Sequence, residues 1–353
     1  MTNPAYISSA DPATLASFDG VIDVRSPGEF AEDHLPNAIN LPVLDDDERA
    51  RVGTIYVRES RFRARRIGAA LVARNISNHL ENALSDRPAD FRPLVYCWRG
   101  GQRSASMAII LSQIGWRTTV LEGGYRTYRR RVQTRLYTDH LPHRFCLLDG
   151  GTGCAKTEML SRLSALGVQC LDLEALAGHR GSLFGGYEGQ GQPSQKLFES
   201  RLLAQIEALD PSRPVVLEAE SSKIGARVIP PALWKAMADA PCIELVAAPE
   251  QRANYLVNAY ADIVSSRAAL DRALARLPVY PGRHRLEELT GLAEQKDFQG
   301  LARTVIEHYY DPAYARSRKV RARPVLSVVE MNALGADDQN RAAEEIAARL
   351  SRL

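Results

Sequence analysis

The chain has 353 residues, of which 45% are hydrophobic and 25% are charged, and its formal net charge is +3. This length predicts about two domains, and the composition is typical of a globular protein with a buried core. Because the net charge is so small, the sequence excludes nucleic-acid binding driven by overall charge and leaves only local arginine clusters for that purpose.

The cysteines and the hydropathy pattern bear on the compartment. The number of cysteines is odd and no pair shows CxxC spacing, which argues against a disulfide framework and against a zinc site made only of cysteines. The first residues show neither a basic n-region nor an apolar h-region, and no apolar run approaches the roughly 20 residues of a membrane span. We therefore expect reduced thiols, a cytoplasmic location and no membrane contact. The cysteines are Cys97, Cys146, Cys154, Cys170 and Cys242.

Short apolar runs alternate with helical patterns along the chain, and this alternation predicts parallel α/β sheets. We expect two such sheets, one in a domain over 1–135 and one in a domain over 140–353, with an arginine-rich polar helix or linker over 125–143. From about residue 265 the chain is rich in arginine and helix formers, which predicts a helical C-terminal extension. The expected strands are 20–24, 94–96, 118–121, 145–148, 168–171, 215–217 and 243–247, and the clearest helices are 104–114, 156–166 and 195–209.

A cysteine directly follows the expected strand 94–96. After Cys97 come a loop with two glycines and a helix whose N-cap we assign to Ser104. The loop amides, the helix N-terminus and the side chains of Arg99 and Arg103 would surround the sulfur, favouring a thiolate and an anion bound on it. Such surroundings suit a cysteine nucleophile for sulfur-group or phosphorus-group chemistry. A buried, inert cysteine at a strand end is the alternative.

The residues around this loop resemble the rhodanese family. The resemblance rests on the strings IDVRSPGEF at 22–30, HLPNAINLP at 34–42 and VLEGGY at 120–125. In that family the loop cysteine carries a persulfide or a related adduct, which the resemblance assigns to Cys97. Arg103 stands one position farther from the cysteine than in the usual sulfurtransferase loop. We therefore expect a wider cradle, which suits an atom larger than sulfur, such as selenium.

A second motif, GGTGCAKT at 150–157, follows the expected strand 145–148 and opens a helix. This context is that of a P-loop, in which backbone amides form an anion nest and Lys156 reaches the phosphates. Thr157 is a candidate Mg²⁺ ligand. Ala155 replaces the usual glycine, and we expect a helix-compatible backbone there, which alanine tolerates. The predicted phosphate-binding residues are Gly150, Gly151, Thr152, Gly153, Cys154, Ala155, Lys156 and Thr157, and a glycine-rich turn without a ligand is the alternative.

Polar residues at two other places are candidate partners of the P-loop. The expected strand 215–217 runs into Glu218 and Glu220, as a Walker B strand runs into acids, and we expect one of them to organise a metal or a water. Surface carboxylates at a strand end are the alternative. His179 and Arg180 lie in a glycine-rich stretch that we interpret as a binding loop near the phosphates, and a plain surface loop is the alternative.

Together the two motifs resemble the tRNA 2-selenouridine synthase family over nearly the whole chain. The shared strings are YCWRGGQRS at 96–104, GTGCAKT at 151–157, HRG at 179–181 and QPSQ at 192–195. The resemblance implies an enzyme that replaces the 2-sulfur of wobble 2-thiouridine in tRNA with selenium from selenophosphate, through an S-geranylated intermediate made from geranyl diphosphate. Cys97 would then serve selenium transfer and the P-loop would hold a diphosphate. We expect no tightly bound cofactor, with Mg²⁺ at the P-loop as a candidate, and the enzyme that makes selenophosphate as a candidate partner.

A tRNA-binding surface requires local positive charge, and a wobble base must be unstacked to react, which aromatic side chains often assist by stacking on it. For the arginine runs a solvated helix face is the alternative, and for the tryptophan beside the cysteine it is a core position. The tRNA-binding candidates are Trp98, Arg129, Arg130, Arg131, Arg318 and Lys319.

Two other functions stay open on the sequence. One is an ATP-dependent tRNA sulfurtransferase with a persulfide on Cys97, which predicts nucleotide turnover that depends on Lys156. The other is a non-enzymatic, nucleotide-gated RNA-binding module, which predicts that Cys97→Ser leaves function intact. The reactive surroundings of the cysteine argue against this module.

Overall fold

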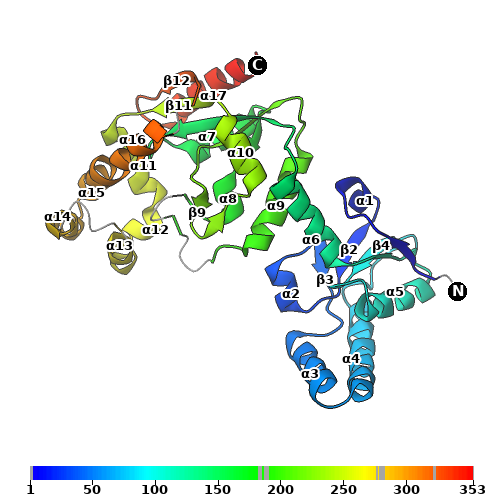
Figure 1. Cartoon of the computed structure of the whole chain (residues 1–353). Helices are drawn as coiled ribbons and strands as arrows, with labels where there is room; N and C mark the ends of the chain where they lie inside the picture. Colours follow the sequence, from blue (N-terminus) through cyan, green and yellow to red (C-terminus); the bar gives the residue numbers. More distant parts are fainter. Residues whose placement is uncertain are drawn as a thin grey trace. The chain divides into compact units, whose positions relative to one another are not determined.

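The chain divides into two compact units (Figure 1). The computed structural model describes residues 3–181, 185–186, 191–275, 277, 283–320 and 323–352, and no side chain in 283–286 or 317–320. The first unit comprises Met1–Asp139 and Ser194–Glu207, and the second comprises His140–Pro193 and Ala208–Leu353. The sequence placed everything after residue 140 in one domain, whereas the structure groups a helix from that part of the chain with the first unit.

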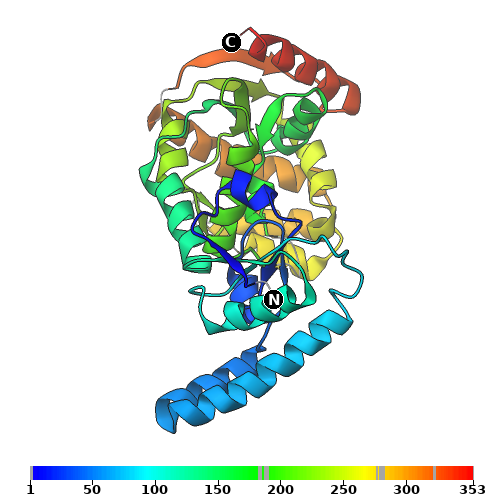
Figure 2. The same cartoon turned by 90° about the vertical axis from the view of Figure 1, so that its right-hand side faces the viewer.

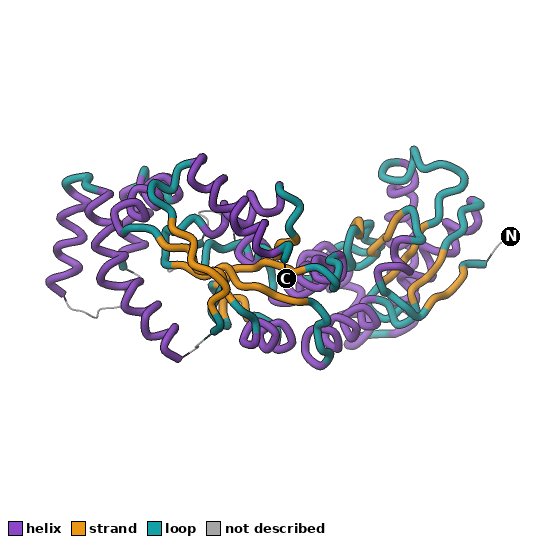
Figure 3. The backbone as a smooth tube through the Cα atoms, turned by 90° about the horizontal axis from the view of Figure 1, so that it is seen from above, coloured by secondary structure: helices purple, strands orange, loops and turns teal. Residues whose placement is uncertain are grey.

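The first unit is built on a five-stranded parallel sheet in the order β1-β5-β4-β2-β3. Figure 3 shows helices on both sides of the strands. The three strands expected from the sequence are confirmed. The two edge strands were not expected, because they are short and none of their residues is buried. Cys97 follows the central strand at its carboxyl edge, where ligand sites of parallel sheets lie. The strands are β1 (Ala5–Ile7), β2 (Gly20–Asp23), β3 (Ala38–Asn40), β4 (Pro93–Tyr96) and β5 (Thr119–Leu121).

The helices of the first unit differ from expectation in two places. Helix α5 begins at Gln102 with Gly101 as its N-cap, so the assignment of Ser104 as N-cap is wrong and Ser104 is buried in the first turn. Residues 125–138 form an amphipathic helix and a π-helical turn, which bury four side chains on one face and belong to this unit. The helices are α1 (Pro12–Ala16), α2 (Pro27–Glu32), α3 (Asp46–Arg58), α4 (Arg61–Glu81), α5 (Gln102–Ile114), α6 (Tyr125–Gln133) and η1 (Thr134–Thr138).

Helix α9 (Gln195–Ala208) was expected as a helix of the second domain, but most of it lies with the first unit, next to α6 (Figure 1). Ion pairs join the two helices, from Arg129 to Glu199 and from Arg131 to Glu207. Glu199 is only 1% exposed, so its pairing with Arg129 is needed to keep a buried charge neutralised.

The second unit is built on a parallel sheet in the order β12-β11-β6-β8-β7. The four strands expected here are confirmed. The outer strand β12 was not expected, because it lies beyond a long helical stretch of the chain. The P-loop follows β6, the central strand, which pairs with β11 on one side and with β8 on the other. The strands are β6 (Arg144–Gly150), β7 (Gln169–Leu171), β8 (Pro214–Glu218), β11 (Cys242–Val246) and β12 (Val325–Glu330), and a two-residue antiparallel pair is formed by β9 (Lys223–Ile224) and β10 (Arg227–Val228).

Helices pack on this sheet and also form a separate apolar cluster. Helices α7 and α17 bury Met159, Leu163 and Ile346 against the strands. The expected C-terminal helical extension is confirmed in α11–α16, whose cluster includes Leu270, Leu289 and Leu301. No helix that the structure describes is both long and apolar enough to cross a membrane. The helices are α7 (Lys156–Ala165), α8 (Leu173–Ala177), α10 (Pro231–Asp239), α11 (Pro249–Ala259), α12 (Ala261–Val264), α13 (Arg267–Leu274), α14 (Arg283–Glu294), α15 (Phe298–Val305), η2 (Ile306–Tyr310), α16 (Asp311–Val320) and α17 (Ala336–Leu350).

Candidate functional sites

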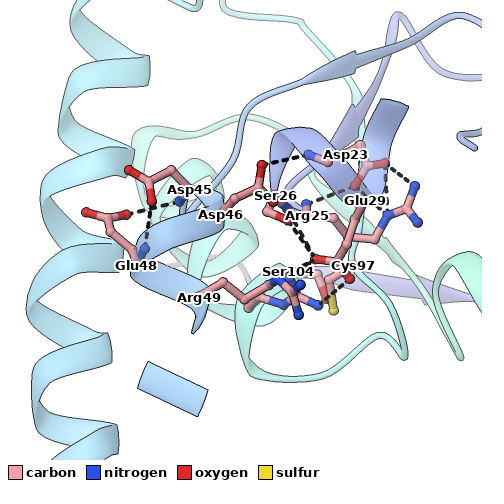
Figure 4. A network of polar contacts seen from close by, with 12 residues as sticks. Asp23, Arg25, Ser26, Glu29, Asp45, Asp46, Glu48, Arg49, Cys97 and Ser104 are labelled. Atoms are coloured by element: carbon pink, nitrogen blue, oxygen red, sulfur yellow. Dashed lines mark hydrogen bonds and ion pairs between the residues drawn. The ribbon is translucent and has the colours of Figure 1, made fainter. Parts of the chain in front are cut away.

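Cys97 lies between the end of β4 and the N-terminus of α5 (Figure 4). Its Sγ accepts a hydrogen bond from the backbone N–H of Gly101 at 3.3 Å and lies 3.2 Å from Oγ of Ser104. These polar contacts and the N-terminus of α5 suit an anion bound at this place. Ser104 therefore contributes to the site through its hydroxyl and not as a helix cap.

A glycine pair on the β5–α6 loop holds the back of the cysteine loop. Gly124 has φ 56° and ψ −144°, and a Cβ there would overlap the carbonyl oxygen of Cys97. The backbone N–H of Tyr125 donates to that same oxygen at 2.8 Å. The GGY string at 123–125 is thus explained by a close approach of two backbone segments, which only glycine permits.

The two arginines of the cysteine loop lie in different surroundings. Arg103 Nη1 donates to Glu29 Oε2 at 2.7 Å, and Arg49 Nε lies 3.7 Å from the same oxygen. Burial alone would raise the pKa of Glu29, but Arg103 and the other donors hold it below its usual value. Arg99 is exposed and forms no ion pair within the described residues. Arg99 is therefore available to an incoming anion, whereas Arg103 already has a carboxylate partner.

The tRNA-binding candidates of the first unit are also distributed unevenly. Arg129 and Arg131 form the ion pairs with α9, and Arg130 alone of the three is exposed. Trp98 is half-buried, with its ring centroid 5.2 Å from that of Tyr125. The side chains of the other two candidates, Arg318 and Lys319, lie outside the described residues.

The P-loop connects β6 to α7, which begins at Lys156. Ala155 has φ 55° and ψ 34°, so the expectation of a helix-compatible backbone there is wrong. A left-handed backbone costs a residue with a Cβ roughly 1–2 kcal/mol, which explains why glycine is usual at this position. Gly153 also has a positive φ, of 87°.

Lys156 points back into the P-loop. Its Nζ donates to the carbonyl oxygen of Gly150 at 2.8 Å and lies 5.7 Å from the ring centroid of Tyr314. Burial acts to lower the pKa of Lys156, but Tyr314, Cys154 and Glu220 together raise it above its ordinary value. The ammonium group therefore stays charged, and a bound phosphate would compete for it with the loop carbonyl.

Glu174, on α8, is a site residue that the sequence analysis missed. Its Oε2 accepts a hydrogen bond from Thr157 Oγ1 at 3.0 Å. Burial, followed by the neighbouring charge of Glu220, raises the pKa of Glu174 to about 8. A signal was present, because Asp172-Leu173-Glu174 directly follows the expected strand 168–171 and so lies at the same sheet edge as the P-loop.

The structure separates the two acids predicted from the sequence. Glu220 lines the cavity at the P-loop. Glu218 is fully buried beneath it, where its Oε2 accepts a hydrogen bond from the backbone N–H of Leu173 at 3.1 Å. Burial, followed by the charges of Asp172 and Glu174, raises the pKa of Glu218 well above its usual value. Glu218 therefore fixes the start of α8, and the two acids that line the cavity beside the P-loop are Glu220 and Glu174.

His179 and Arg180 both line the same cavity. The ring of His179 accepts a hydrogen bond from the backbone N–H of Gly181 at 3.1 Å. Arg180 forms an ion pair with Asp262 at 3.0 Å, and its guanidinium lies 4.9 Å from the ring centroid of Tyr260. The structure thus brings this predicted loop to the P-loop, with Arg180 held by the helical extension.

Arg252, on α11, supports the P-loop from the other side and was also missed. Its Nε donates to the carbonyl oxygen of Thr152 at 2.8 Å, and its Nη2 lies 2.7 Å from Oδ1 of Asp311. A Cβ at Gly151 would lie 2.6 Å from this guanidinium, so a side chain at residue 151 would displace it. No local signal could have identified Arg252, because its partners are distant in the sequence.

The P-loop opens into a cavity of about 860 Å³ that is lined by both polar and apolar side chains. Lys156, Thr157, Glu174 and Glu220 contribute polar groups. Aromatic and aliphatic side chains also line this cavity, namely Tyr255, Leu256, Ala259, Tyr260, Tyr310 and Tyr314.

A second pocket of about 70 Å³ lies within the helical extension and has an almost wholly apolar lining. It shares Thr152, Leu256, Tyr260 and Tyr310 with the first cavity, so the two adjoin at the P-loop. Its other walls come from α12, α13 and α15, including Phe298. The site therefore combines the P-loop at one end with an apolar pocket at the other.

Comparison with known proteins assigns both halves of the chain. Residues 143–276 match the model of the tRNA 2-selenouridine synthase AAA domain, and residues 10–131 match that of the rhodanese-like domain. A tRNA 2-selenouridine synthase from Hahella chejuensis is 33% identical over 86% of this chain and 87% of the relative. One from Shewanella denitrificans is 34% identical over 74% of this chain and 71% of the relative.

A solved structure of the N-terminal domain of a putative ATP/GTP binding protein from Clostridium difficile 630 covers 35% of this chain and 98% of its own, with 37% identity and a TM-score of 0.31. The identity to the two synthases extends over more than two thirds of this chain and of each relative. The chain therefore belongs to the tRNA 2-selenouridine synthase family.

Proposed function

We propose that this enzyme modifies tRNA by replacing the 2-sulfur of wobble 2-thiouridine with selenium from selenophosphate, through an S-geranylated intermediate made from geranyl diphosphate. The sulfur first attacks the geranyl carbon, so that a C–S bond forms, a C–O bond breaks and diphosphate leaves. The selenium of selenophosphate then attacks C2 of the base, so that a C–Se bond forms, the C–S bond breaks and the S-geranyl group leaves with its electron pair as a thiolate. Water attacks the phosphorus, and the P–Se bond breaks as phosphate leaves. Alkylation is required because a thiocarbonyl sulfur is a poor leaving group.

The observation that carries this proposal is the junction of the two pockets at the P-loop. A ligand with a diphosphate at one end and an unbroken apolar chain at the other matches this lining. A nucleotide would instead place a polar ribose and base beyond its phosphates. The apolar pocket adjoins the loop at Thr152, Leu256 and Tyr260, which suits the start of such a chain.

The departing diphosphate carries charge that the P-loop is equipped to stabilise. The ammonium of Lys156 and the loop amides supply positive charge and donors in a largely buried site. A Mg²⁺ ion also fits, since Thr157, Glu174 and Glu220 offer the oxygen ligands it prefers. Such an ion would neutralise the leaving group. It would also relieve the repulsion between the two carboxylates.

The cysteine site is suited to the selenium half of the reaction. Selenophosphate is an anion, and the amide of Gly101, the start of α5 and exposed Arg99 favour an anion beside Cys97. We therefore assign the binding of selenophosphate to this site, with tRNA as substrate and the enzyme that makes selenophosphate as a partner. A cytoplasmic location accords with such a substrate.

The test uses purified protein and a tRNA that carries wobble 2-thiouridine, with geranyl diphosphate and selenophosphate supplied separately and together. Nucleosides are then analysed by mass spectrometry, with Cys97→Ser and Lys156→Ala as variants. We expect Lys156→Ala to lose the geranylated nucleoside and Cys97→Ser to lose the selenated one. ATP hydrolysis without any mass change at the base would instead support the sulfurtransferase function.

A further inference from the structure

Helices α3 and α4 form an antiparallel hairpin that projects from the first unit, as both Figure 1 and Figure 2 show. At 1.5 Å per residue, α3 alone extends for roughly 20 Å. The two helices pack on each other through Ile55, Ala64 and Gly68, and a Cβ at Gly68 would already touch Val52 at 3.4 Å. The hairpin is thus a built element, but no site described so far uses its outer part.

The hairpin carries a long run of exposed arginines. Residues 51–74 contain seven arginines and a single acid, Glu59, whereas the whole chain has a net charge of only +3. All seven arginines are exposed, and Arg63 alone forms an ion pair, with Glu59 at 2.6 Å, among the described residues. They are Arg51, Arg58, Arg61, Arg63, Arg65, Arg66 and Arg74.

The tip of the hairpin adds exposed aromatic surface. Phe62 is 75% exposed at the start of α4, and Tyr56 near the end of α3 is 42% exposed, with the guanidinium of Arg61 5.6 Å from its ring centroid. Large exposed apolar side chains of the hairpin are confined to this tip, while arginines continue along both helices. This arrangement favours an extended polyanion with bases that can stack, and not a membrane, which would require an apolar face along a helix.

The base of the hairpin is tied to the cysteine site. Asp46, the first residue of α3, accepts a hydrogen bond from the backbone N–H of Gly28 at 3.0 Å. Arg49, one turn later, lies beside the carboxylate of Glu29 (Figure 4). Arg103, in the first turn of α5, binds the same carboxylate. A ligand that lies along the hairpin is therefore led to the neighbourhood of Cys97.

We propose that α3–α4 is an RNA-binding arm that holds tRNA phosphates on its exposed arginines and stacks a nucleotide on Phe62. This inference rests on the proposed function, in which tRNA is the substrate. The arm supplies local positive charge that a net charge of +3 does not provide, and it leaves Arg129 and Arg131 to their structural ion pairs.

The experiment measures binding of the full-length protein to a fluorescently labelled, unmodified tRNA transcript across a series of salt concentrations. Arg65→Gln/Arg66→Gln should weaken binding and lower the slope of log affinity against log salt by about two, one for each lost phosphate contact. The control, Arg87→Gln/Arg117→Gln, removes the same charge at the amino-terminal edge of the sheet and should leave the slope unchanged.

A second pair of variants tests the stacking contact. Phe62→Ala should weaken binding roughly tenfold, while Phe62→Tyr should retain it. All these side chains are exposed, so we expect each variant to fold, and thermal unfolding checks that it does. Binding equal to the wild type in Arg65→Gln/Arg66→Gln would overturn the proposal. So would arginine-dependent binding to phosphatidylglycerol vesicles with no effect on tRNA binding.

Because the assay reads binding and not product, its outcome is independent of the chemistry. If the arm variant loses tRNA while the wild type forms no modified nucleoside, the arm stands and the proposed reaction fails. If the wild type modifies tRNA and the arm variant binds it normally, the arm fails and the reaction stands.

Discussion

Thr157 and Glu174 are joined by a hydrogen bond of 3.0 Å from Oγ1 to Oε2, which places a carboxyl group of raised pKa at the start of the helix that follows the P-loop. The second carboxyl group, Glu220, is 8% exposed. Because two buried carboxylates repel each other, this arrangement favours a proton on Glu174 or a cation between the two groups.

We predict that Glu174→Gln flattens the pH dependence of stability. The pKa of about 8 in the folded protein lies above the ordinary 4.5, so the stabilisation is complete at low pH and is lost as pH rises through about 8. Between about pH 4.5 and pH 8, the melting temperature of the wild type should therefore fall more steeply than that of the variant. The exposed Glu344→Gln serves as control, and equal slopes for Glu174→Gln and wild type would refute the assignment.

Removing Asp311 and removing Arg252 should lower the free energy of unfolding by different amounts, although either change breaks the same ion pair. Asp311→Ala leaves a guanidinium that is 6% exposed without its carboxylate and should cost about 3 kcal/mol. Arg252→Met removes the buried charge itself and should cost less, about 1–2 kcal/mol, mainly through the lost hydrogen bond to Thr152. Urea unfolding measures both values, and the reverse order would show that Asp311 is not the partner on which Arg252 depends.

The backbone contact behind Cys97 can be tested with two glycines. Gly124→Ala forces a Cβ into the carbonyl of Cys97 at a positive φ and should destabilise the protein by roughly 3 kcal/mol. Gly101→Ala adds a Cβ with nothing within 4 Å and should cost much less. Chemical unfolding gives the two free energies, and iodoacetamide should alkylate Cys97 faster in Gly124→Ala. Similar unfolding energies for both would mean that the loop yields more easily than its packing indicates.

Filling the apolar pocket should separate the two ends of the proposed ligand. Ala302 lines this pocket, and Ala302→Leu should raise the KM for geranyl diphosphate roughly tenfold by occupying the space of its chain. Inhibition by inorganic diphosphate should not change, since the P-loop is untouched. Equal weakening of both ligands would argue that the pocket does not receive the chain.

The parts of the fold that follow from local patterns could be predicted from the sequence. Apolar runs flanked by glycines located the strands before Cys97 and before the P-loop, because a buried parallel strand is marked by its own residues. The short edge strands β1 and β3 lack that mark, since none of their residues is buried. Strand β12 contains apolar residues, but it lies beyond a long helical stretch of the chain, where the sequence gives no reason to expect a further strand of the same sheet. The backbone of Ala155 was misjudged because the sequence shows residue type and not φ.

Site residues that act through distant partners could not be predicted in the same way. Arg252 contacts a loop and an aspartate far from it in sequence, so no spacing identifies it. Glu174 follows a strand at the right edge, but the sequence gives no strand order, and only the pairing of β7 with β8 brings it to Glu220. Arg129 and Arg131 look like a nucleic-acid patch until α9 supplies their carboxylates.

Helix α9 also constrains how the protein is made. Its residues, 194–207, complete the first unit, yet the ribosome adds them only after the P-loop and two strands of the second unit. During synthesis Arg129 and Arg131 therefore lack their partners, Glu199 and Glu207, until more than fifty further residues have been added. A fragment that stops at residue 139 would lack the same helix, so the two halves of this enzyme are not separable by a single cut in the gene.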